Sequence, residues 1–149
     1  LSAVGTSANH IRWQPNGASS TWSIANAWNN FVYWLANGNL TLDYNDFYWV
    51  TWLTDATGGV TSITNTRVFY GRPAVNDGAF FRPSGGTNTL TNVEILGATA
   101  AAGLAVSVTG GTNSIDQVTV VGCTTGVSWT TSVALTATNV KVVRCVTGS

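Results

Sequence analysis

Acidic side chains are the first candidates for chemistry, because a glycosidase needs two carboxyl groups roughly 5–10 Å apart. The 149 residues include six Asp and Glu in total. Asp46 and Asp77 each precede an aromatic segment of strand type, so the two could stack in neighbouring repeats of a regular fold. The alternative is that both make local hydrogen bonds in turns, which Asp favours. We expect the turn role and keep Asp46 and Asp77 as the weaker, catalytic alternative.

Other catalytic chemistry finds less support. His10 is the single histidine, and no Gly-x-Ser-x-Gly motif places a serine nucleophile at a sharp turn. The Gly-Gly turns lack the Lys and the helix of a phosphate-binding loop. Cys123 and Cys145 have no third or fourth soft ligand to complete a metal site. We therefore expect no metal and no cofactor, and we lean toward a non-enzymatic protein.

Aromatic side chains are better candidates for a binding surface. The chain has seven Trp, and aromatic residues are concentrated in 47–52. If this segment is a strand, its aromatic residues alternate between two faces, and one face must point away from the core. Exposed rings stack on sugars or bury against another subunit, and core packing is the remaining alternative. The candidates are Tyr48, Trp49, Trp52, Phe69, Tyr70 and Phe80.

A repeat must position these residues. The segment 58–65, GGVTSITN, recurs as GGTNTLTN at 85–92 and as GGTNSIDQ at 110–117, starting 27 and then 25 residues later. Repeats of this length are typical of solenoids, in which each unit buries its apolar face against its neighbours. The chain is therefore expected to stack similar coils.

Alternating apolar and polar residues after each Gly-Gly turn predict strands. A second strand is predicted in each unit, at 79–81, 104–106 and 127–129. The register predicts two inner columns and one outer column, with Arg67 beside Glu94 in the outer one. The inner columns are Ile63, Leu90 and Ile115, and Val68, Ile95, Val120 and Val142; the outer column is Arg67, Glu94, Thr119 and Lys141. The predicted fold is all-β, a short right-handed parallel β-helix of about four to five coils.

The two ends differ. Residues 23–36 have an apolar stripe at helical spacing, which predicts an α-helix that caps the first coil or binds a partner. We expect residues 1–39 to form an N-terminal arm with this capping helix and 40–149 to form the β-helix, within one structural domain. No cap is visible at the C-terminal end, so we expect a second chain to cover it in a symmetric oligomer, unless the chain is a fragment.

Cys123 and Cys145 occupy equivalent places one coil apart, as a disulfide or as two thiols.

Composition excludes several partners. Only 8% of residues are charged, with six basic against six acidic side chains. Nucleic acid binding needs clustered Lys and Arg, so no nucleic acid partner is expected. The apolar stripe is too short for membrane insertion. A surface with so little charge is typical of extracellular and virion proteins, where we expect this chain.

The strand triads at 93–95, 118–120 and 140–142 and the Gly-Gly-Thr-Asn turns at 85–88 and 110–113 resemble right-handed parallel β-helix proteins of the pectin-lyase-like kind. Within that group the chain is most similar to the β-helical parts of bacteriophage tailspikes and related virion proteins. The resemblance implies a trimer on a virus particle that recognises or cleaves host surface glycans. No catalytic residue of the family can be carried over, because no cluster of carboxylates lies on one face.

The predicted function is a non-enzymatic virion component, in a phage tail, fibre or capsid decoration. It would act in assembly or host attachment as a homotrimer, with other virion proteins and host glycans as partners. One alternative is a polysaccharide-degrading β-helix enzyme. Another is a secreted adhesin or ice-binding solenoid, which a flat array of threonines would favour, although we expect the threonines mostly in turns.

Overall fold

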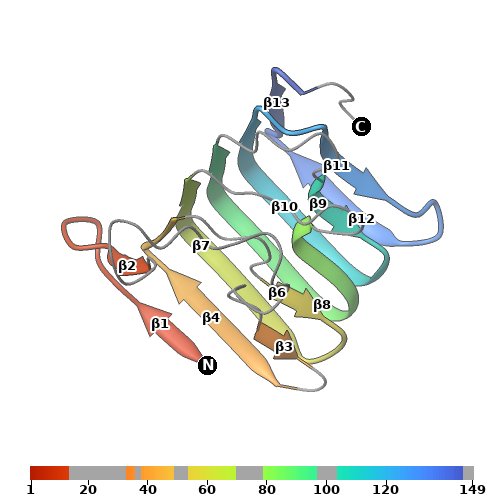
Figure 1. Cartoon of the computed structure of the whole chain (residues 1–149). Helices are drawn as coiled ribbons and strands as arrows, with labels where there is room; N and C mark the ends of the chain where they lie inside the picture. The colour runs from red at the N-terminus through yellow and green to blue at the C-terminus, as the bar shows by residue number, and fades with distance from the viewer. Residues whose placement is uncertain (14–32, 36–37, 49–53, 70–78, 97–103, 146–149) are drawn as a thin grey trace, which may run out of the picture.

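The computed structural model describes residues 1–13, 33–35, 38–48, 54–69, 79–96 and 104–145. These residues form an all-β parallel solenoid of about three turns (Figure 1). Every strand pairing among them is parallel, as the repeat predicts for stacked coils. The prediction of a parallel β-helix is therefore confirmed at the level of architecture.

Three stacks of strands build the coils. The first stack pairs in the order β1 (Ser2–Val4), β4 (Asn39–Asp43), β7 (Val60–Phe69), β8 (Ala79–Leu96), β10 (Gly110–Val121) and β12 (Ala134–Thr138). The second stack joins β2 (Ile11–Trp13), β5 (Asn45–Tyr48) and β13 (Lys141–Val143) to the later halves of β7, β8 and β10. The third contains β3 (Tyr33–Leu35), β6 (Thr54–Ala56), β9 (Leu104–Val108), β11 (Thr125–Trp129) and the start of β8.

The first and second stacks meet at a column of residues with left-handed backbone. Asn65, Asn92 and Gln117 have φ values of 46°, 54° and 53° within β7, β8 and β10. Tyr44 and Asn139 continue the column with φ values of 53°. At Asn65 the alternation of buried residues in β7 shifts by one position, from Thr61 and Ile63 to Thr66 and Val68. Because Asn adopts this conformation more readily than most residues, the last position of the sequence repeat sets the bend of each coil.

The inner columns form the core. Ile63 pairs with Leu90 and Leu90 with Ile115, and all three are at most 2% exposed. Val68, Ile95 and Val120 stack in the same way, and Val142 extends their column as a partly buried residue. The predicted second strands at 79–81, 104–106 and 127–129 are also confirmed, with Phe80 and Phe81 buried in the core.

The Gly-Gly turns allow neighbouring coils to approach closely. Gly86 and Gly111 have φ values of 73° and 79°, in the region that favours glycine. A Cβ atom on Gly86 would lie 2.5 Å from the backbone oxygen of Gly59 in the preceding coil. The turn therefore requires glycine for its conformation and for the contact between coils.

The N-terminal third differs from its prediction. The end of the helix predicted over 23–36 is wrong, because Tyr33–Leu35 is strand β3 and pairs with β6. Aromatic residues favour strands, and β6 offers them a ladder. The other residues of that segment lie outside the described part of the chain. β1 and β2 pair with β4 and β5, so the described parts of the expected arm extend the solenoid. The coil count and the capping helix are not confirmed.

Candidate functional site

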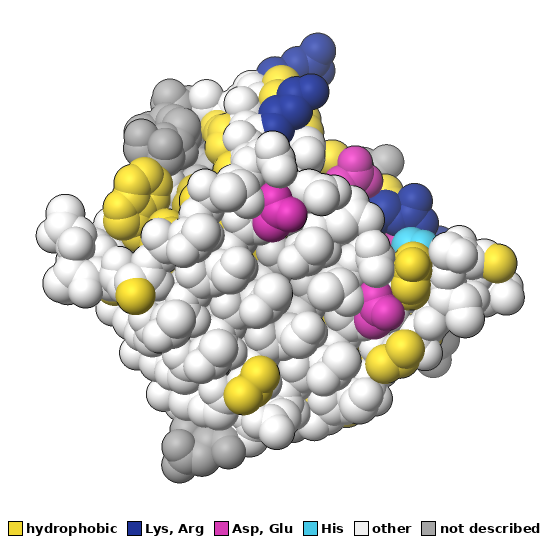
Figure 2. Space-filling model, turned by 180° about the vertical axis from the view of Figure 1, so that it is seen from behind, with side chains coloured by type: hydrophobic (Ala, Val, Ile, Leu, Met, Phe, Trp, Pro, Cys, Tyr) yellow, Lys and Arg dark blue, Asp and Glu magenta, His cyan; other side chains and the backbone are white. Residues whose placement is uncertain are grey.

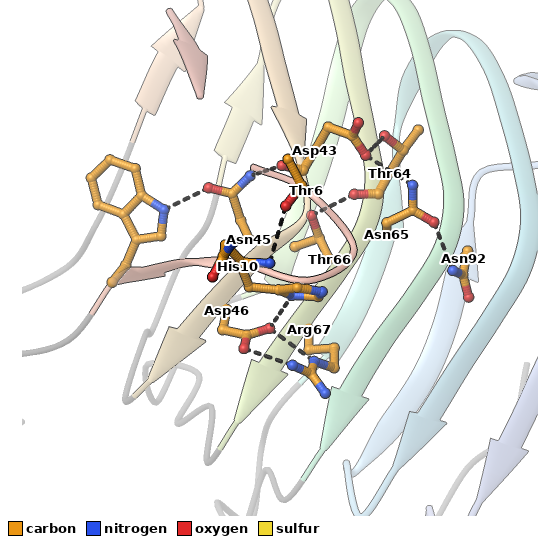
Figure 3. Close-up of polar contacts among 12 residues, drawn as sticks. Thr6, His10, Asp43, Asn45, Asp46, Thr64, Asn65, Thr66, Arg67 and Asn92 are labelled. Atoms are coloured by element: carbon orange, nitrogen blue, oxygen red, sulfur yellow. Dashed lines mark hydrogen bonds and ion pairs between the residues drawn. The ribbon is translucent and has the colours of Figure 1, made fainter. Parts of the chain in front are cut away.

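Charged and aromatic side chains gather where β2, β5 and β7 lie side by side. Figure 3 shows the contacts of Asp46 with His10 and Arg67 at this place. Arg12, Asp46 and Arg67 occupy equivalent positions on these three strands. This outer column lies beyond the bend, where the alternation of buried residues has shifted by one position. The backbone N–H of Ile11 donates to the carbonyl of Tyr44, which holds the start of β2 beside the residue that precedes β5. We call the following residues the charged corner: His10, Arg12, Asp46, Tyr48, Arg67 and Phe69.

Asp46 is the centre of the charged corner. Nε and Nη2 of Arg67 donate to the two carboxylate oxygens at 2.8 and 2.7 Å, and Nδ1 of His10 contacts Oδ1 at 2.9 Å. The aspartate is only 8% exposed, while 42% of the Arg67 side chain remains exposed. His10 in turn packs edge-on against Tyr44, with ring centroids 5.4 Å apart. The carboxylate is thus held by two partners that are distant in the sequence: Arg67 in strand β7, 21 residues away, and His10 just before strand β2, 36 residues away.

These contacts set the ionisation of the pair. Burial raises the pKa of Asp46, but the hydrogen bonds from Arg67 and His10 outweigh it, so the pKa lies below its usual value of 3.8. The hydrogen bond to Asp46 raises the pKa of Arg67. Asp46 and Arg67 are therefore both charged at neutral pH.

A stack of flat groups lies beside the ion pair. The guanidinium of Arg12 lies 4.4 Å from the ring centroid of Tyr48, and Tyr48 stacks on Phe69 with centroids 4.8 Å apart and planes 16° apart. Arg67 lies over the Phe69 ring at 5.3 Å. Arg12 and Phe69 thus both pack against Tyr48, so the stack presents the exposed Arg12 at its end.

The candidate residues from the sequence lie in different parts of the structure. Tyr48 and Phe69 meet in the charged corner as half-buried side chains. Phe80 is fully buried in the core, which was one of the alternatives for the aromatic residues. The expected turn role of Asp46 is wrong, because Asp46 lies in strand β5 and its partners Arg67 and His10 are 21 and 36 residues away. Both of its carboxylate oxygens are engaged, which favours a positioning role over an acid–base role. The remaining candidates, Trp49, Trp52, Tyr70 and Asp77, lie outside the described residues.

Sequence reasoning missed two members of the charged corner. His10 and Arg12 were assigned to an irregular arm, and no pattern in the sequence connects them to Asp46. Arg67 does lie beside Glu94 in the register, as predicted, but it forms its ion pair with Asp46 on the other side. The signal that would have found this pair is the 21-residue step from Asp46 to Arg67, one coil of the solenoid.

A second surface is formed by the outer face of the first stack. Outward hydroxyl side chains on six neighbouring strands form one unbroken column. Thr87 and Thr112 flank it on one side, and Thr64 and Thr91 on the other. Most threonines among the described residues therefore lie in strands, and for these residues the expectation that threonines lie mostly in turns is wrong. We call this surface the hydroxyl face; its central column is Ser2, Thr41, Ser62, Thr89, Ser114 and Thr136.

The hydroxyl face is broad, even and nearly free of charged and hydrophobic side chains (Figure 2). Its acidic residues, Asp43 and Asp116, are held by neighbours: Asp43 accepts hydrogen bonds from Thr64 and Asn65, and Asp116 accepts them from Thr138 and Asn139. Within the described part of the chain, the hydroxyls of the central column make no hydrogen bond to other residues. They are therefore available to an external partner.

An apolar hollow lies between β11, β12 and β13. Its volume is about 560 Å³, and its walls include Trp129, which is 47% exposed, together with Leu135 and Val142. Nearby, Cys123 and Cys145 occupy adjacent coils as thiols; no disulfide joins them. The backbone N–H of Cys123 donates to Sγ of Cys145 at 3.3 Å.

No group of three or more His, Cys, Asp or Glu among the described residues is placed to hold a metal ion. The described part of the chain also contains no helix of the length and hydropathy needed to cross a membrane. Comparisons of the chain with protein-family models, with curated proteins and with solved structures each find no match. The assignment of function therefore depends on the geometry of the two surfaces.

Proposed function

We propose that the chain is a non-enzymatic attachment solenoid that binds a surface polysaccharide through its hydroxyl face. The observation that carries the proposal is the unbroken column of outward Ser and Thr hydroxyls across six strands. Neighbouring strands lie about 4.8 Å apart, so the column offers donors and acceptors at a constant interval. A polysaccharide chain repeats its own hydroxyls along its length, and the two can form many weak hydrogen bonds in parallel.

A panel of immobilised bacterial surface polysaccharides tests the proposal. Thr89 lies at the centre of the column, and Thr119 lies on a different outer face, in the column that also contains Glu94. We expect at least one polysaccharide to retain the wild-type chain and Thr119→Tyr, while Thr89→Tyr passes through, because the larger side chain lifts the ligand off the face. If no polysaccharide is retained, or if the two variants behave alike, the proposal fails.

A place in a virus particle and a trimeric assembly are part of the same proposal. The low charge of the chain and the apolar hollow beside β12 support a subunit contact at that end of the solenoid. Burying the exposed Trp129 against another subunit would remove a large apolar side chain from water. Light scattering of the intact chain gives the number of subunits, and a monomer at micromolar concentration would contradict the trimer.

Ice binding is a second candidate, and the spacing of the hydroxyl face favours it. Water oxygens joined by a hydrogen bond are about 2.8 Å apart, and tetrahedral geometry places two neighbours of one water about 4.5 Å apart. The interval of about 4.8 Å between strands is close to that second distance. A face with few charges and with a column of free hydroxyls can therefore hold an ordered layer of water. Thermal hysteresis in the wild type and Thr119→Tyr, but not in Thr89→Tyr, would establish this function; its absence from the wild type would dismiss it.

A further inference from the structure

We propose that Arg12, Arg67 and the hydroxyl of Tyr48 form a binding site for an oxyanion group, a carboxylate or a sulfate, carried by an acidic saccharide. This site lies in the charged corner and is separate from the hydroxyl face. It does not depend on the function proposed for that face.

The charges of the outer column alternate in sign across four neighbouring strands, in the order Arg12, Asp46, Arg67 and Glu94. Arg67 thus lies between two acidic side chains, whereas Arg12 is the last charge of the column among the described strands. Asp46 accepts two hydrogen bonds from a guanidinium group, and Arg67 donates both of them. Arg12 is exposed and forms no ion pair with any residue in the described ranges. An anion is therefore the partner that suits the Arg12 guanidinium.

The donors of the site are held in place before a ligand arrives. Arg12 is packed on the ring of Tyr48, and Tyr48 is packed on Phe69. Arg67 is fixed by its bidentate contact with Asp46, which leaves its Nη1 amino group directed away from that carboxylate. Within the described part of the chain, neither the Arg12 guanidinium nor the Tyr48 hydroxyl donates to another residue. Such ordering lowers the entropy cost of binding.

The geometry of the donors favours a planar or tetrahedral oxyanion. A guanidinium presents a rigid fork of N–H groups that matches two oxygens of a carboxylate or a sulfate. Strands β2 and β7 are separated by β5, so their backbones lie about 9.6 Å apart, with Asp46 between the two arginines in the register. An oxyanion that contacts both guanidinium groups therefore has to lie on the solvent side of Asp46. The phenol of Tyr48 adds a neutral donor on the same outer face. A saccharide is the favoured carrier because the donors lie at the surface: Arg12 is exposed, and Tyr48 and Arg67 are half-buried.

The test uses three hexasaccharides of the same length in isothermal titration calorimetry: one carboxylated, one both carboxylated and sulfated, and one neutral after carboxyl reduction. We expect both acidic ligands to bind and the neutral one not to bind. Stronger binding of the sulfated ligand identifies sulfate as the preferred group, and equal binding identifies carboxylate. Arg12→Gln should weaken acidic binding by about tenfold or more, because it removes a charge-assisted pair. Tyr48→Phe should weaken it by a smaller factor.

Lys141→Gln is the matched control, since it removes one positive charge from the same outer column on β13, at the other end of the solenoid. It should change the affinity less than twofold, which is within the expected range for a distant charge in physiological salt. The urea midpoint of Arg12→Gln should equal that of the wild type, because Arg12 is exposed. Equal binding of neutral and acidic ligands, no binding of either acidic ligand, or equal losses in Arg12→Gln and Lys141→Gln would overturn the inference. Thr89→Tyr should bind the acidic ligands normally, which separates this result from the test of the hydroxyl face.

Discussion

The substitution Asp46→Asn removes the charge at the centre of the corner while keeping the shape of the side chain. Asp46 accepts three hydrogen bonds at 2.7–2.9 Å and is 8% exposed, so its carboxylate depends on its partners more than on water. A hydrogen bond to a charged group contributes about 1.5–3 kcal/mol in protected sites, but an exposed ion pair contributes at most about 1 kcal/mol. Since the Arg67 side chain is 42% exposed, we discount its share. The expected loss is about 2 kcal/mol of unfolding free energy.

Urea denaturation followed by circular dichroism measures this loss as a change in midpoint at constant slope. Asp116→Asn is the matched control: it makes the same change at a residue whose partners, Thr138 and Asn139, are both exposed, and it should be less destabilising. A stability of Asp46→Asn within about 0.5 kcal/mol of the wild type would refute the reasoning, because changes of that size are typical of substitutions away from specific contacts.

The pKa of Asp46 gives the same contact a pH dependence. Its pKa is lower in the folded chain than the ordinary value of 3.8. The stabilisation is therefore complete above the unfolded pKa and is lost as the pH falls through the folded one. We expect the stability difference between the wild type and Asp46→Asn to be present at pH 5 and to narrow below about pH 4. Urea midpoints measured across this range test the sign; a difference that widens in acid would contradict it.

Three further outcomes follow from the packing of the coils. Leu90→Ala should lose about 3 kcal/mol in urea denaturation, because Leu90 is 2% exposed at the centre of an inner column, whereas Thr89→Ala should lose less than about 0.5 kcal/mol. Gly86→Ala should lose at least about 2 kcal/mol in the same assay, because the new Cβ is forced into the left-handed region and against Gly59; a loss smaller than that of Thr89→Ala would contradict this. Alkylation of the native chain should modify Cys145 before Cys123, which is 2% exposed, and mass spectrometry of peptides gives the order.

The regular part of the fold was predictable because the repeat fixes its own register. Gly-Gly turns at equal positions place Ile63, Leu90 and Ile115 in one column, and the structure has that pairing. The prediction failed for Tyr33–Leu35, where an apolar stripe fits helical spacing but a ladder with β6 was available. A short apolar segment fits both periods, and only the tertiary partner decides between them.

The charged corner was only partly predictable for a different reason. Asp46 and Tyr48 were candidates by residue type, but His10 reaches Asp46 across 36 residues, and this contact depends on β2 joining the sheet. The choice of Arg67 between Asp46 and Glu94 depends on burial: the register offers both acids, and Asp46 is the one shielded from water. Spacing in the sequence gives neighbours in a solenoid, whereas depth from the surface decides which neighbour forms the ion pair.

The column of left-handed residues determines how such a chain can change length during evolution. Asn65, Asn92 and Gln117 bend their coils at equivalent positions. A duplication that copies one whole coil therefore brings its own bend, its own inner apolar residue and its own outer hydroxyl. Each such copy lengthens the molecule by about 4.8 Å and adds one unit to the hydroxyl face. An insertion of a single residue within a strand would instead move the later side chains of that strand to the opposite face. Duplication of whole coils therefore lengthens the solenoid without disturbing its faces, and the reach of the binding surface grows in steps of one repeat.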